Sequence, residues 1–397
     1  METNTLEVKL EVCAGLDVHA KTVVACVLTG SLDSLRAKKE IRTFGTRTFE
    51  LRLLGEWLTE KKVEKVLMES TGQYWCPIWN VLEEFDLPLA LANPQRIKGI
   101  PGRKTDQKDS EWIARLGRMG LVASSYIPSR EIQELRSLTR TRKSYINERT
   151  QHRNRVQNVL QHANIKLADF ITDIFNGSGR NCLELLLTGE KATEERVGQV
   201  ISKRCKHSPT DIAESMNGAL SKNQRILLES HLRSLERIDE EMHVLNEAIE
   251  EITSKYAEIM EALQTIPGVK KRAAEIILAE VGPNVEQFSS AKQLASWAGL
   301  CPGSYESGGA RKSAHITSGN KYLKTILYQC GGSAGRSNNT LFSEFYNRIS
   351  KRGSKKKAII ACAHKILRIV YKILSEQPNR VNKKILTRCS EHLVRNN

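Results

Sequence analysis

The stretch VCAGLDVHAKTVVACVLT (residues 12–29) decides the fold of the first third of the chain. It contains two short runs rich in β-branched residues, separated by a polar break at residues 19–21, which is the pattern of a β-hairpin. Asp17 stands in the middle of the first predicted strand. A lone carboxylate among apolar strand residues is costly unless it is paired or bound to a metal ion. Asp17 is therefore the first candidate functional residue.

Strands and helices alternate after this hairpin as far as about residue 125. The predicted elements are a helix over 47–61, a strand over 63–70 ending in Glu69, a helix over 74–86, a strand over 87–94 and a helix over 106–121 that begins near Asp106. Such alternation predicts an α/β domain.

The overall charge of the chain favours a polyanionic partner. Among 397 residues, 61 are Lys or Arg and 45 are Asp or Glu, which gives a formal net charge of +16. Lys and Arg gain affinity for nucleic acids by releasing counterions from phosphates. A basic balance alone is equally compatible with a non-enzymatic ribosomal or chromatin-type binder, or with a solvated surface.

Nine cysteines show no C-x-x-C pair and no Cys/His cluster at zinc spacing, so we expect reduced thiols in a cytoplasmic protein. The N-terminal residues do not resemble a signal peptide, and no apolar run approaches the length of a membrane span. We therefore expect no membrane association.

The chain changes character after residue 130. Residues 131–162 are predicted to form a long basic helix, and residues 220–263 a second long helix. The segment between them, 163–215, is expected to be irregular. Apolar residues in the second helix recur at alternating steps of three and four, from Leu235 to Ile259. This heptad seam predicts a coiled coil that joins protomers. The alternative is an intramolecular hairpin in which 220–263 packs on 131–162.

Two later segments carry basic residues at predicted turns. The pattern of TIPGVKKRAAEIILAEVG (265–282) resembles a helix-hairpin-helix, whose glycine turn lets backbone N–H groups approach a DNA phosphate. The basic run RISKRGSKKKA (348–358) precedes an apolar helix over 359–374.

Four carboxylates form the most informative set. Asp17 and Glu69 lie in or at the end of predicted strands, and Asp106 and Asp109 share one face of a helix start because they are three residues apart. Three elements thus bring hard oxygen ligands to one sheet edge, which suits Mg²⁺ or Mn²⁺. The alternative is that Asp106 caps its helix and Asp109 pairs with a neighbouring Lys108 or Arg103.

The order of several motifs resembles the DEDD-type transposases of the insertion-sequence one-hundred-ten family. The N-terminal motifs are GLDVHAK, VLMESTGQY and ANPQRIKGIPGRKTDQKDS, and the last of these ends in the diagnostic Lys104, Thr105, Asp106 and Asp109. The C-terminal motifs are IPGV (266–269), FSSAKQLASWAGLCP (288–302), YESGG (305–309) and GNKYLKTIL (319–327). The stretch 163–215 matches none of the family motifs and is interpreted as an insertion.

The resemblance implies an α/β RuvC-like domain of RNase H architecture over 1–128 and a helical coiled-coil region over 129–262. It further implies a mostly α-helical C-terminal transposase domain over 263–380, followed by a basic tail over 381–397. Asp17, Glu69, Asp106 and Asp109 would form the acidic quartet that binds Mg²⁺ or Mn²⁺. Ser307 would be the nucleophile that becomes joined to DNA.

The resemblance also implies the partners. Family members act on donor and target DNA under the guidance of a noncoding bridge RNA, and their homodimers assemble into tetramers. The expected location is the prokaryotic cytoplasm, at the nucleoid during action. The cations expected to contact nucleic acid are Lys104, Arg136, Arg140, Arg153, Lys270, Lys271, Arg311, Lys312, Lys355 and Lys356.

The surroundings of Ser307 are compatible with phosphoryl transfer. Arg311 and Lys312 can offset charge on a scissile phosphate, and the adjacent glycines leave room for a DNA backbone. His315 is a candidate general base, but a single histidine in a loop more often has no such role. We therefore expect the proton of the hydroxyl to be removed from outside the loop, by a metal-bound oxygen or a carboxylate of the quartet. Two rival functions remain at this stage. One is a metal-dependent nuclease or Holliday-junction resolvase that uses water, and the other is a non-catalytic nucleic-acid-binding protein.

Overall fold

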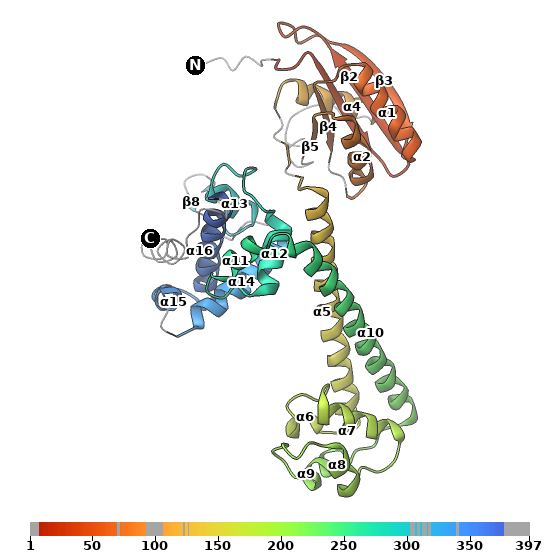
Figure 1. Cartoon of the computed structure of the whole chain (residues 1–397), viewed down its shortest axis with the longest axis vertical. Helices are drawn as coiled ribbons and strands as arrows, with labels where there is room; N and C mark the ends of the chain where they lie inside the picture. Colours follow the sequence, from red (N-terminus) through yellow and green to blue (C-terminus); the bar gives the residue numbers. More distant parts are fainter. Residues whose placement is uncertain are drawn as a thin grey trace. The chain divides into compact units, whose positions relative to one another are not determined.

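The computed structural model divides the chain into two units, Met1–Ile127 and Pro128–Asn397, and each is described here by itself (Figure 1). For residues 106–108, 124–125, 306–307 and 310–311 the structure describes the backbone but not the side chains. The structure describes residues 8–69, 72–92, 106–121, 124–125, 127–301, 306–307, 310–311, 316, 319–338 and 341–376.

The first unit is built on a six-stranded mixed sheet of order β3-β2-β1-β4-β5-β6. The first three strands form an antiparallel meander, β4 runs parallel to β1, β5 runs parallel to β4, and β6 is antiparallel to β5. The strands are β1 (Val12–Val18), β2 (Thr22–Thr29), β3 (Lys38–Gly45), β4 (Lys65–Glu69), β5 (Leu89–Ala92) and β6 (Ser124–Ser125). The predicted hairpin and α/β domain are confirmed.

Helices cover both faces of the sheet. Because side chains alternate along a strand, Val23, Ala25 and Val27 of β2 pack with α1 (Thr48–Glu60) and α2 (Trp75–Leu82). Cys26 and Leu28 face the other way and pack with α4 (Asp106–Arg118). A short 3₁₀ turn, η1 (Glu83–Phe85), follows α2. The central strands are thus buried on both faces, as parallel strands require, whereas the edge strand β3 has no buried residue.

The second unit begins with a long helix pair. Helix α5 (Arg130–His162) packs along α10 (Lys222–Ser254), as Figure 1 shows. Leu235, Ile238 and Met242 of the predicted seam are buried. The seam is therefore buried within one chain, as the hairpin alternative expected, and its pairing between protomers stays a prediction. The prediction of a single helix over 220–263 was wrong, because α10 ends at Ser254 and a separate helix, α11 (Ala257–Gln264), follows it.

The segment 163–215 is helical, and the expectation of irregular structure was wrong. It folds into α6 (Leu167–Phe170), α7 (Gly177–Thr188), α8 (Glu194–Val200) and α9 (Pro209–Ser215). Their apolar residues form one core with Leu228 and Leu232 of α10. Helices this short carry too few turns for a clear apolar period, so their stability comes from tertiary packing.

The C-terminal part is an all-helical core apart from one small hairpin. Its apolar helix α16 packs against α13, α14 and α15. Its elements are α12 (Lys271–Val281), α13 (Ala291–Trp297), β7 (Glu306–Ser307), β8 (Ala310–Arg311), α14 (Lys321–Arg336), α15 (Leu341–Arg352) and α16 (Lys355–Ser375). In the part of the chain that the structure describes, no helix is long and apolar enough to cross a membrane.

The glycine turn between α11 and α12 packs inside this core. Gly268 has φ +85°, and a Cβ there would lie 2.5 Å from the carbonyl oxygen of Cys330 on α14. Glycine is therefore required by both the backbone conformation and the close approach of α14. Binding of DNA by this turn, as in a helix-hairpin-helix, stays a prediction.

A buried ion pair fastens the long hairpin to this core. Arg142 of α5 lies 2.6 Å from Glu275 of α12, and both side chains are only 3% exposed. Arg142 also donates a hydrogen bond to Asn246 of α10, at 3.0 Å. Three helices therefore meet at one guanidinium.

We expect Glu275→Gln to destabilise the helical unit by about 3 to 5 kcal/mol, because it leaves the Arg142 charge buried without a counter-charge. Urea unfolding followed by circular dichroism measures the loss. The matched control is Glu250→Gln, which breaks the exposed pair with Lys271 (2.8 Å) and should cost less than about 0.5 kcal/mol. Equal losses in the two variants would contradict the structural role of the buried pair.

Candidate active site

Two predicted acidic residues lie side by side at the carboxyl end of the central strands. The parallel register of β1 and β4 pairs Leu16 with Met68, so Asp17 and Glu69 come next on each strand. Leu16 and Met68 pack in the core with α1 and α2. Because side chains alternate, Asp17 and Glu69 point to the opposite face, which is the face that α4 covers.

Helix α4 lies directly on β1. A Cβ at Gly15 would stand 2.2 Å from the carbonyl oxygen of Ser110 and 2.3 Å from the backbone nitrogen of Ala114. One turn further along, Gly117 packs against the sulfur of Cys13. Helix α4 therefore runs opposite to β1, and its N-terminal turn, which holds Asp109, reaches the Asp17 end of the strand.

The electrostatics of Asp17 reflect this crowding. Burial raises the pKa of its carboxyl above the ordinary value. A hydrogen bond from His19 Nε2 to Asp17 Oδ2 (3.1 Å) lowers the pKa, whereas the nearby carboxylates of Asp109 and Glu69 raise it. Two of the other predicted acidic residues therefore lie near enough to Asp17 to repel its charge, and like charges held together are typical of sites that bind a cation or carry out chemistry.

The fourth predicted ligand is only partly described. Asp106 begins α4, one helical turn before Asp109, and its side chain lies outside the described residues. Among the described side chains, no three His, Cys, Asp or Glu lie close enough together to hold a metal ion. Asp17, Glu69 and Asp109 nevertheless fit a divalent cation by chemistry, since they supply the hard oxygen donors that such an ion prefers.

Ser307 is placed by its backbone alone. It lies in β7, where it pairs with Ala310 of β8 in an antiparallel hairpin, and Gly308 and Gly309 connect the two strands in the sequence. Sequence reasoning expected a loop here. The side chains of Ser307 and Arg311 lie outside the described residues, as do Lys312 and His315.

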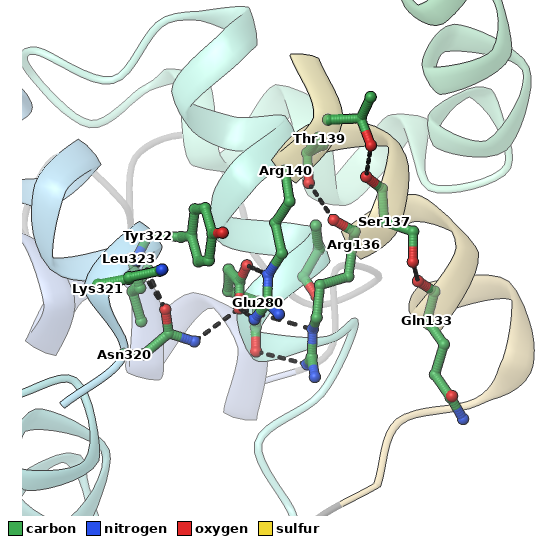
Figure 2. A network of polar contacts seen from close by, with 12 residues as sticks. Gln133, Arg136, Ser137, Thr139, Arg140, Glu280, Asn320, Lys321, Tyr322 and Leu323 are labelled. Atoms are coloured by element: carbon green, nitrogen blue, oxygen red, sulfur yellow. Dashed lines mark hydrogen bonds and ion pairs between the residues drawn. The ribbon is translucent and has the colours of Figure 1, made fainter. Parts of the chain in front are cut away.

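Several cations expected to contact nucleic acid have partners within the chain. Arg140 makes a bidentate ion pair with Glu280 of α12, at 2.8 Å for each nitrogen (Figure 2). Arg136 donates to the carbonyl oxygens of Ala279 and Glu280, each at 3.0 Å. Arg153 stacks over the ring of Phe175 at 4.7 Å. Their contact with phosphates stays a prediction, because these positions are already engaged.

The remaining predicted cations divide into two groups. Lys270, Lys355 and Lys356 are exposed, and Lys271 is exposed but paired with Glu250. Lys104 lies outside the described residues.

Sequence reasoning missed Glu280, whose side chain is fully buried. Asn320 Nδ2 also donates to Glu280 Oε2 at 2.6 Å, so this carboxylate joins α5, α12 and α14 (Figure 2). The available signal was a carboxylate within the apolar helix sequence AAEIILAEV (273–281), the same signal that identified Asp17.

Comparison with known proteins supports the resemblance across both units. Residues 14–165 match a family described as "Transposase", of DEDD and IS110 type. Residues 260–347 match the "Transposase IS116/IS110/IS902 family". The chain belongs to the IS110 family of transposases. The two matched regions include Asp17, Glu69, Asp106, Asp109 and Ser307.

Individual relatives agree with this family. A "Probable family 20 transposase" of Pseudomonas aeruginosa is 26% identical over 321 residues, which cover 79% of this chain and 84% of the relative. A "Pilin gene-inverting protein" of Moraxella bovis is 34% identical over 117 residues, covering 29% of this chain and 36% of that protein. Among solved structures, T. thermophilus RuvC in complex with a Holliday junction substrate aligns with 29% of this chain and 100% of its own, with 14% identity and a TM-score of 0.23.

We expect Gly15→Ala to disable this IS110 transposase by moving α4 away from β1. The added methyl group would overlap backbone atoms that cannot rotate away, at a cost of about 1 to 3 kcal/mol. Thermal unfolding and strand-exchange assays measure the two effects. Gly198→Ala is the control, because its Cβ would meet only Pro209 at 3.8 Å. Retained stability and exchange in Gly15→Ala would show that the close approach is dispensable.

We expect Asp17→Asn to raise the melting temperature of the metal-free transposase, because it removes a half-buried charge from a group of like charges. Mg²⁺ at about 100 times its Kd should stabilise the unmodified protein by about 2.7 kcal/mol, and the variant much less. Differential scanning calorimetry with and without Mg²⁺ measures both.

The control for this experiment is Asp86→Asn, an exposed residue with φ +52° after η1, where asparagine is well tolerated. It should respond to Mg²⁺ as the unmodified protein does. An undiminished Mg²⁺ effect in Asp17→Asn would exclude Asp17 as a metal ligand.

Proposed function

We propose that this IS110 transposase exchanges DNA strands through a covalent phosphodiester between Ser307 and DNA, assisted by a divalent metal and guided by a noncoding RNA. The observation that carries the proposal is that Asp17 and Glu69 end adjacent parallel strands on the α4 face of the sheet, near Asp109 of α4. Structural carboxylates are usually separated or paired with cations, whereas here two carboxylates repel Asp17 and His19 opposes that repulsion.

Asp17, Glu69, Asp106 and Asp109 would hold Mg²⁺ or Mn²⁺. When bound, such an ion neutralises phosphate charge and orients the reacting oxygens. Glu69 stands at the carboxyl end of a parallel strand, where side chains can point out of the sheet toward a ligand. The half-buried position of Asp17 limits its hydration, which strengthens its attraction for a cation.

Ser307 would carry the covalent step. Its hydroxyl loses a proton to a base, its Oγ forms a bond to the scissile phosphorus, and the bond from phosphorus to the leaving sugar oxygen breaks. The leaving oxygen takes up a proton, so atoms and charge balance. The phosphodiester energy is conserved in the serine–DNA bond, which explains how strands can be rejoined without ATP. Arg311 and Lys312 would offset the charge of the pentavalent transition state.

Membership of the transposase family and the printed name of one relative both favour strand exchange over simple cleavage. A relative that is 34% identical over 117 residues is called a gene-inverting protein, and inversion requires both breakage and rejoining of DNA. The net charge of +16 fits simultaneous contact with DNA and RNA. Guidance by a bridge RNA, a Holliday-junction-like intermediate and assembly of dimers into tetramers follow from the resemblance.

The test is the formation of a covalent adduct on labelled donor and target DNA, in the presence of the noncoding RNA transcribed beside the gene. We expect the unmodified transposase to give a protein–DNA band that survives denaturing electrophoresis, and Ser307→Ala to give none. Ser304→Ala, in the same segment, is the matched control and should retain the band.

Three results would contradict the proposal in different ways. An adduct that persists in Ser307→Ala would assign the nucleophile to another residue. Cleaved ends without any adduct from the unmodified protein would indicate hydrolysis by water. Adduct formation that does not need the RNA would remove the guidance while leaving the serine chemistry intact.

A further inference from the structure

A groove in the second unit lies away from the residues of the acidic quartet and Ser307 in sequence. It is bounded by α5, α12 and α14 and has a volume of about 580 Å³, which is within the range of sites that hold small ligands. Its lining includes the cations Arg140, Arg142, Lys143, Arg272 and Lys321.

The cations of the groove fall into two classes. Arg140 and Arg142 are neutralised by Glu280 and Glu275, as described above. Among the residues that the structure describes, no carboxylate pairs with Lys143, Arg272 or Lys321, each of which comes from a different helix. These three cations therefore give the groove a net positive charge that the chain itself does not compensate, so the groove attracts an anion.

The rest of the lining is not typical of a purely ionic site. Ile146, Ile276 and Ile326 supply an apolar surface, and the ring of Tyr322 stands beside them. The guanidinium of Arg140 lies 4.5 Å from the centre of that ring and is held in place by its bidentate pair with Glu280 (Figure 2). One wall of the groove is thus a rigid planar surface, and rigid planar groups of this kind stack on nucleic-acid bases.

Helix α14 adds polar groups. Lys321 is its first residue, and Asn320 caps it by accepting hydrogen bonds from the backbone nitrogens of Tyr322 and Leu323. The amides of Asn147 and Gln329 face the groove from α5 and α14. Phosphate charge, an apolar base face and base-edge hydrogen bonds are the three features of a nucleotide, and the groove matches each of them.

We propose that this groove binds an unpaired stretch of single-stranded nucleic acid, with phosphates at Lys143, Arg272 and Lys321 and a base against the apolar wall. A duplex fits less well, because its base faces are covered by stacking and only its phosphates and base edges are available. Strand exchange creates unpaired strands, and the groove would hold one of them. The proposal does not depend on the chemistry of Ser307 or of the quartet.

The test compares two triple variants of the full-length transposase that lose the same charge. The groove variant combines Lys143→Gln, Arg272→Gln and Lys321→Gln. The control combines Lys203→Gln, Lys206→Gln and Lys222→Gln, which are exposed and lie outside the groove. Binding of an oligodeoxythymidylate of roughly 12 nucleotides is measured by fluorescence anisotropy at several salt concentrations.

We expect the groove variant to bind this strand on the order of tenfold or more weakly, and its log–log salt slope to fall by about 2, since each phosphate contact in a single strand contributes about 0.7. The control should change by less than about twofold. An abasic strand separates base contact from charge. The advantage of thymidine over abasic sites should shrink in the groove variant and persist in the control.

A second pair of probes identifies the kind of strand. Oligouridylate of the same length replaces the DNA strand, and the nucleic acid that shows the larger loss in the groove variant is the natural occupant. Circular dichroism melting checks the fold. If the triple variant fails to fold, the single variants Arg272→Gln and Lys321→Gln, both at exposed positions, serve in its place.

Three results would overturn the proposal. Equal weakening by the groove and control variants would mean that only overall charge matters. An undiminished preference for thymidine over abasic sites would remove the base contact. A duplex of the same length that loses as much affinity as the single strand would show that the groove does not select unpaired nucleic acid. None of these measurements requires cleavage, so they leave the serine mechanism unaffected.

Discussion

The free-energy cost of burying a carboxylate organises both units of this transposase. An ionised carboxyl group removed from water has to be matched by cations, by hydrogen bonds or by a metal ion. In the second unit, arginine side chains provide the cations that match the buried carboxylates. Glu275 and Glu280 lie within an otherwise apolar helix, and guanidinium groups from α5 reach both. These ion pairs fix where the long hairpin meets the C-terminal core, because a misplaced hairpin would leave two buried charges without partners.

In the first unit, the partly buried carboxylate of Asp17 has different surroundings. Asp17 is 14% exposed and has one histidine beside it, while its other charged neighbours include Asp109 and Glu69, which repel it. The backbone contact at Gly15 holds α4 against β1 and so maintains this repulsion. An arrangement of like charges that costs folding energy is expected at functional sites. Asp17, beside other carboxylates, thus differs from Glu280, which is held by arginines.

The same distinction applies to the positive charge. Much of the basic character of α5 is used inside the chain, where Arg136, Arg140 and Arg142 neutralise carboxylates or hold backbone oxygens. A net charge of +16 is consequently a poor guide to which cations meet nucleic acid. Lys143 and Arg272, which pair with no carboxylate among the described residues, are better candidates for contact with phosphates. They were not distinguishable in the sequence, since their neighbours along the helix are equally basic.

The sequence by itself determined the family, the α/β character of the first unit, the β1–β2 hairpin and the acidic residues of the candidate site. Each of these depends on local patterns: alternation along a strand, a carboxylate among apolar residues, and motifs in a fixed order. The helices within 163–215 escaped prediction, because they are stabilised by packing on α10 rather than by their own periodicity. Only the tertiary structure decided that the seam of α10 is buried within its own chain, and that Arg136 and Arg140 hold Glu280. Both depend on contacts between residues far apart in the sequence, and the pattern of one segment carries no record of which distant segment compensates its charges or covers its apolar face.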